Sequence, residues 1–109
     1  MCIFKKKNVA DKVKDDRELI SLNAKSIDSL IVLAKDNRDM TSQLKELREK
    51  IAYLIPSDNS KVVDYDKSIK NKIGDLRIAL TKSNGETSKK TDETICDIQL
   101  TIADRNARL

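Results

Sequence analysis

The residues that could bind a metal ion are few in this sequence. Two carboxylates stand two apart in the segment DYD, at Asp64 and Asp66, and three more follow at Asp92, Glu93 and Asp97. Carboxylate oxygens are the ligands that Ca²⁺ and Mg²⁺ prefer. Side chains two apart on a helix point in different directions, however, and carboxylates near a helix start are explained by the helix dipole. We therefore predict no metal site.

Patterns typical of catalysis or cofactor binding do not occur either. The chain contains no histidine, no glycine-rich phosphate loop and no GxSxG segment that would activate a serine. Its two cysteines, Cys2 and Cys96, are too few for a disulfide framework and lack the companion ligands that zinc needs. We expect no catalytic residues, no cofactor and no small-molecule ligand, which favours a protein that acts by binding other macromolecules.

The positive charge is concentrated at the beginning of the chain. The net charge is +4, and residues 1–14 carry all of it. The rest is neutral, with acidic and basic side chains interleaved, and so lacks the basic face of a specific nucleic-acid-binding domain. Lys5, Lys6 and Lys7 could contact an anionic membrane surface at about 1 kcal/mol per lysine. The simpler interpretation of residues 1–14 is a basic, mobile tail.

Length and composition favour one all-α domain after this tail. The chain has 109 residues, of which 37% are charged and 3% aromatic, with two glycines and one proline. Such a composition is typical of helical proteins, and the length allows one modest core. No apolar run of about 18 residues offers a membrane span, and the lysine-rich start lacks the apolar segment of a signal peptide. We predict a single helical domain over residues 15–109 of a cytoplasmic protein.

The segment DNRDM, residues 36–40, decides how many helices this domain has. Apolar residues at three- and four-residue spacing run before and after it, and Leu33 and Met40 are one heptad apart. The apolar seam therefore keeps its phase across the segment, which contains neither glycine nor proline. We predict one helix over about residues 15–55, with helical φ and ψ at Asn37.

The alternative is a break near Asn37. Asn37 could take the left-handed conformation that ends a helix, and Asp39 could cap a new helix through the amides of Thr41 or Ser42. The chain would then form an up-and-down four-helix bundle. One observation favours this alternative, because the earlier apolar stripe runs one residue out of phase with the seam that starts at Leu30.

Two further helices are predicted over about residues 60–82 and 88–108, separated by a turn at Gly85. With the end of the long first helix they should form a three-helix bundle with a coiled-coil-like seam. Tyr53 and Tyr65 flank the loop before residue 60 and should close that end of the bundle. The predicted inner positions are Val62, Tyr65, Ile69, Ile73, Leu76 and Leu80 in the second helix and Ile95, Ile98, Ile102 and Leu109 in the third.

The first half of the long helix would then stay uncovered. A hairpin of two helices about 30 Å long covers only its last 20 or so residues. The uncovered half carries an apolar stripe formed by Val13, Ile20, Ala24, Ile27 and Ile31. Because such a stripe seeks a partner, we predict a homo-oligomer, or a complex with another helical protein, through residues 13–34.

The resulting functional hypothesis is a small cytoplasmic helical interaction or scaffold protein that acts through self-association. The alternative function is a peripheral membrane or polyanion-binding module that attaches through Lys5, Lys6 and Lys7.

Overall fold

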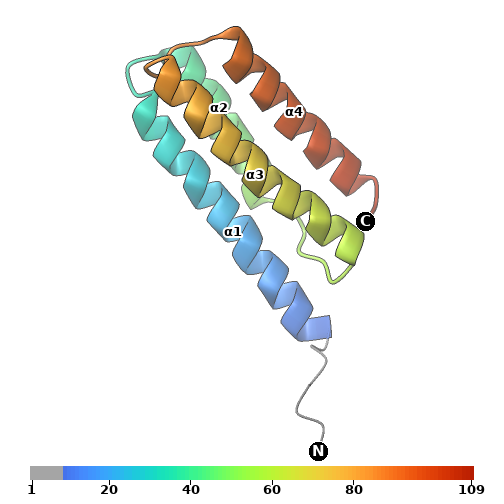
Figure 1. Cartoon of the computed structure of the whole chain (residues 1–109). Coiled ribbons are helices and arrows are strands. Elements are labelled where there is room, and N and C mark those ends of the chain that lie inside the picture. Colours follow the sequence, from blue (N-terminus) through green and yellow to red (C-terminus); the bar gives the residue numbers. More distant parts are fainter. Residues whose placement is uncertain (1–8) are drawn as a thin grey trace, which may run out of the picture.

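The computed structural model describes residues 9–109, and this part of the chain is all-α with four helices (Figure 1). They are α1 (Val9–Leu33), α2 (Arg38–Ala52), α3 (Ser60–Lys82) and α4 (Lys89–Asn106). Successive helices run in opposite directions, so α1 begins and α4 ends at the same end of the bundle (Figure 1). α1 packs against α2 and α3, and α3 packs against α4, whereas the contact between α2 and α4 is the smallest.

The predicted continuous helix over residues 15–55 is wrong. Asn37 has φ −114° and ψ 105°, which is extended backbone, and it forms the N-cap of α2. Its side-chain Oδ1 accepts a hydrogen bond from the amide of Met40 at 3.0 Å. Asparagine favours this position because its short side chain satisfies an amide that has no partner within the helix. The four-helix alternative is therefore correct, but Asn37 itself is the cap, in place of Asp39, and it is not left-handed.

The predicted apolar seam across the break connects Leu33, which is exposed, with Met40, which is buried. Leu33 is 42% exposed at the end of α1, whereas Met40 is fully buried in α2. The inner face of α1 instead includes Leu30 and Ala34, which are 0% and 1% exposed. The heptad between Leu33 and Met40 thus did not describe one continuous surface.

The turn between α1 and α2 and the turn between α3 and α4 lie at the same end of the bundle and are connected by a hydrogen bond. The helix α3 ends in a Schellman motif, in which the amide of Gly85 donates to the carbonyl of Leu80 at 2.8 Å. Asn84 and Gly85 have φ of 54° and 80°. Asn37 donates from Nδ2 to Glu86 Oε2 at 3.1 Å, which connects the cap of α2 to the segment between α3 and α4.

The bounds of α3 and α4 agree with the predicted helices at residues 60–82 and 88–108, whereas α1 begins at Val9, inside the segment assigned to the tail. Gly74, inside α3, has no described atom within 4 Å of where a Cβ would stand, so no neighbouring helix requires a glycine there.

One core cluster runs through all four helices. Its residues are Ile20, Ala24, Ile27, Leu30, Ala34, Met40, Leu44, Leu47, Ile51, Leu54, Ile69, Ile73, Leu76, Leu80, Ile95, Ile98 and Ile102.

Replacing Ile69 or Ile98 with alanine should lower the free energy of unfolding by at least about 2 kcal/mol, because both side chains are fully buried and truncation leaves a cavity. Urea denaturation measures this loss. Ile78→Ala is the matched control, since Ile78 is 56% exposed and its truncation should change stability by less than about 0.5 kcal/mol. Equal losses at buried and exposed positions would contradict the assigned core.

Candidate functional site

The predicted self-association stripe lies mostly inside the bundle. Ile20, Ala24 and Ile27 are 4%, 5% and 0% exposed and belong to the core, and Val13 and Ile31 are half-buried. α2 folds back along α1 and, with α3, covers the face that a continuous helix would have left bare. The expectation of an exposed stripe over residues 13–34 is therefore wrong. Self-association stays a prediction, but it needs a different surface.

The basic residues assigned to surface contact, Lys5, Lys6 and Lys7, lie outside the described residues. Their contact with an anionic surface stays a prediction. Within residues 9–109, no helix has the length and apolar character needed to cross a membrane.

A cluster of three charged side chains is buried at the end of the bundle where α1 begins and α4 ends. Asp16 of α1, Asp66 of α3 and Arg105 of α4 each have a side chain that is 0% exposed. Arg105 donates from Nε to Asp66 Oδ1 at 2.7 Å and from Nη2 to Asp66 Oδ2 at 3.2 Å. Its Nη2 also lies 3.3 Å from Asp16 Oδ2. We call these three residues the buried ionic centre.

The buried ionic centre also holds the loop between α2 and α3. Arg105 Nη2 donates to the carbonyl oxygen of Ile55 at 2.7 Å. The amide of Ser57 donates to Asp16 Oδ2 at 2.8 Å. Three helices and this loop therefore meet at one set of charge-assisted hydrogen bonds, which are stronger than neutral ones.

The charges of the centre do not balance when both carboxylates are ionised, because two negative groups share one guanidinium. Among the described atoms, Asp16 Oδ1 and Arg105 Nη1 find no hydrogen-bond partner. The pKa of Asp66 is raised from 3.8 to about 7, mainly by burial and next by hydrogen bonding with Asp16, while Arg105 opposes the rise. Asp66 is therefore the carboxylate of the centre that burial drives toward its protonated form.

Sequence reasoning missed this centre, although the sequence carries a signal for it. Asp66 stands three residues before Ile69, and Arg105 stands three residues after Ile102, so both fall on the predicted inner faces. Acidic and basic residues at inner positions of different helices indicate a buried ion pair. The segment DYD instead draws attention to Asp64 and Asp66 as a pair of carboxylates, of which Asp64 is exposed.

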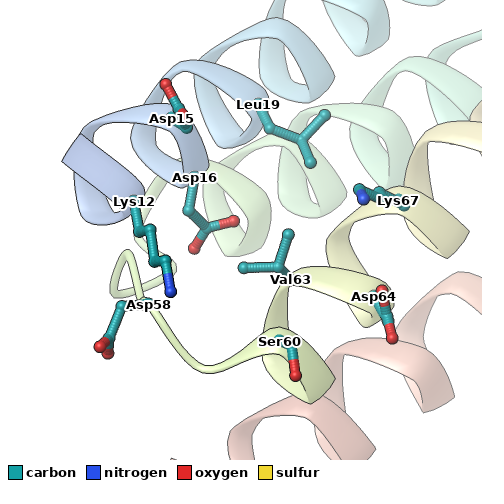
Figure 2. A pocket seen from close by; sticks show the side chains of 9 residues that line it. All are labelled: Lys12, Asp15, Asp16, Leu19, Asp58, Ser60, Val63, Asp64 and Lys67. Atoms are coloured by element: carbon teal, nitrogen blue, oxygen red, sulfur yellow. The ribbon is translucent and has the colours of Figure 1, made fainter. Parts of the chain in front are cut away.

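Asp16 also forms part of the wall of a cavity of about 350 Å³ between the first half of α1 and the start of α3 (Figure 2). Four carboxylates and two ammonium groups line it, and Asp16 is already bonded to Ser57 and Arg105. No group of three or more His, Cys, Asp or Glu residues within 9–109 could hold a metal ion. Its lining residues are Lys12, Asp15, Asp16, Leu19, Asp58, Ser60, Val63, Asp64 and Lys67.

A second hollow, of about 480 Å³, separates the end of α2 from the second half of α4, where helix contact is smallest. Three apolar side chains that line it are largely exposed: Tyr53 at 83%, Ile55 at 64% and Leu109 at 57%. The predictions that Tyr53 closes the bundle and that Leu109 faces the core are therefore wrong. We call this hollow the α2–α4 groove, and its lining residues are Lys50, Tyr53, Leu54, Ile55, Gln99, Ile102, Ala103, Asn106 and Leu109.

The described chain thus presents one buried ionic centre and, beside it, one apolar groove. No protein-family model matches this chain, and neither curated proteins nor solved structures give a match.

Proposed function

We propose that this protein is a small helical interaction module that self-associates through the α2–α4 groove. The observation that carries the proposal is the exposure of Tyr53, Ile55 and Leu109 around a hollow where two helices pack only weakly. Large apolar side chains gathered at one surface hollow are typical of binding surfaces. Tyrosine is in addition one of the residues most often found to dominate the binding energy of an interface.

A second copy of the chain is the partner that the lining of the groove favours. Among the described residues that line the groove, Lys50 alone has a charged side chain, so charge complementarity does not select a partner of opposite sign. Gln99 and Asn106 carry amides, which both donate and accept hydrogen bonds and can therefore pair with their own copies across a two-fold axis. Tyr53, at the rim, can enter the groove of the other subunit in the same symmetric arrangement.

Sedimentation equilibrium of the full chain tests this proposal. We expect a concentration-dependent dimer, and we expect Tyr53→Ala or Leu109→Ala to weaken dimerisation at least about tenfold, because each removes an apolar contact at the interface. Ile78→Ala is the matched control, since Ile78 is an exposed apolar residue of α3 outside the groove. A monomer at all accessible concentrations, or equal weakening by the control, would overturn the proposal.

A further inference from the structure

The buried ionic centre and the α2–α4 groove share one segment of backbone. The carbonyl of Ile55 accepts a hydrogen bond from Arg105, while the side chain of Ile55 lines the groove. Two residues later, the amide of Ser57 donates to Asp16. We call residues 55–57 the corner. Arg105, which holds the carbonyl of Ile55, also binds both Asp66 and Asp16. The corner is therefore tied to the charges of the centre.

The centre is neutral only when its two carboxylates hold one proton. If both are ionised, Asp16 and Asp66 carry two negative charges against one positive charge on Arg105, at 0% side-chain exposure. An unbalanced charge kept from water is costly. Asp16 Oδ1, which has no hydrogen-bond partner among the described atoms, then has nothing to offset the loss of hydration.

Other charged groups lie near the centre but are exposed to solvent. The cavity beside Asp16 brings Lys12 and Asp15 from α1, Asp58 from the loop, and Asp64 and Lys67 from α3, and all five are exposed. α4 contributes Arg105, and the chain that follows α2 contributes the carbonyl of Ile55. Water and salt screen exposed charges. The two exposed ammonium groups therefore cannot replace a proton held on the buried carboxyl group of Asp66.

We propose that a proton on the buried Asp66 keeps the corner closed against α4, and that loss of this proton loosens the corner and reshapes the α2–α4 groove. The effect on binding rests on the proposed function of the groove. The effect on the corner does not.

The sign of the pH dependence follows from the direction of the shift. The pKa of Asp66 is raised from 3.8 to about 7, mainly by burial, so the closed structure binds a proton more tightly than the open chain does. Stabilisation by that proton is complete below about pH 4 and is lost as pH rises through about 7. The corner should be closed in mildly acidic solution and loosened in mildly basic solution.

Amide hydrogen exchange of the full chain between pH 5.5 and pH 8 tests the proposal. After correction for the intrinsic exchange rate, protection of the Ser57 amide should fall at least about tenfold over this range. Asp66→Asn cannot ionise and should remove the pH dependence. Asp64→Asn, a matched change at an exposed residue of α3, should leave it as in the unmodified chain. The proposal would be overturned if protection of the Ser57 amide in the unmodified chain did not change between pH 5.5 and pH 8. It would also be overturned if this protection still depended on pH in the Asp66→Asn variant.

A second measurement keeps the proposal testable if Asp66→Asn does not fold. Carboxyl-carbon NMR of the unmodified protein follows Asp66 directly, and its carboxyl group should titrate with a midpoint near 7. Titration of Asp66 below pH 5 would overturn the proposal. Sedimentation equilibrium at pH 5.5 and pH 8 separates it from the proposed function. A pH-dependent corner in a constant monomer rejects the dimer alone, whereas a dimer with a pH-independent corner rejects the proton-dependent corner alone.

Discussion

Replacing Arg105 with methionine is expected to lower the free energy of unfolding at pH 7.5 by about 3–5 kcal/mol. The substitution keeps a long apolar side chain in α4 but removes the positive charge that both Asp16 and Asp66 face at 0% side-chain exposure. Two buried carboxylates are then left without a counter-charge. The carbonyl of Ile55 also loses its donor, which adds the cost of an unpaired buried polar group.

Urea denaturation at two pH values identifies the cause of this loss. At pH 4 the carboxyl groups of the Arg105→Met variant should be protonated, so its deficit should be much smaller than at pH 7.5. Adding Asp16→Asn and Asp66→Asn should recover at least half of the deficit at pH 7.5, because the amides carry no charge. Arg108→Met is the matched control, since Arg108 is exposed after the end of α4. A loss below about 1 kcal/mol for Arg105→Met would contradict a buried, charged centre.

Helix type and most helix ends can be predicted from the sequence, but the break before α2 cannot be recognised from the apolar seam alone. The heptad between Leu33 and Met40 predicts a continuous helix with helical φ and ψ at Asn37, which is wrong. The competing signal was the one-residue difference in phase between the stripe of Ile20, Ala24 and Ile27 and that seam. The structure gives this difference its physical meaning, because a helix that ends and restarts need not keep one phase.

The groove and the buried ionic centre were harder to predict because each depends on how distant segments meet. The exposure of Leu109 follows from the weak contact between α2 and α4, which no local pattern reports. For the centre, inner-face positions identify Asp66 and Arg105 as candidates. Only the tertiary arrangement shows that Asp16, 89 residues before Arg105, faces the same guanidinium.

Replacing Gly85 with alanine is expected to cost about 3 kcal/mol or more, for two reasons. First, Gly85 has φ of 80°, and a residue with a Cβ in the left-handed region costs roughly 1–2 kcal/mol. Second, the added Cβ would collide with the carbonyl oxygen of Leu33 and would stand 3.1 Å from the Cα of Ala34. Both neighbours are backbone atoms at the end of α1, so relief requires the joined turns to separate and the core beneath Ala34 to loosen.

Thermal and urea denaturation of two matched variants separates these causes. Gly74→Ala makes the same chemical change inside α3, where no described atom lies within 4 Å of the new Cβ, and should stabilise the protein by up to about 1 kcal/mol. Gly85→Asn tolerates positive φ better than alanine but still carries a Cβ. If the contact with Leu33 and Ala34 dominates, Gly85→Asn should be nearly as unstable as Gly85→Ala, which is the result we expect. Gly85→Ala within about 0.5 kcal/mol of the unmodified protein would show that α1 and the turn after α3 do not meet in this way.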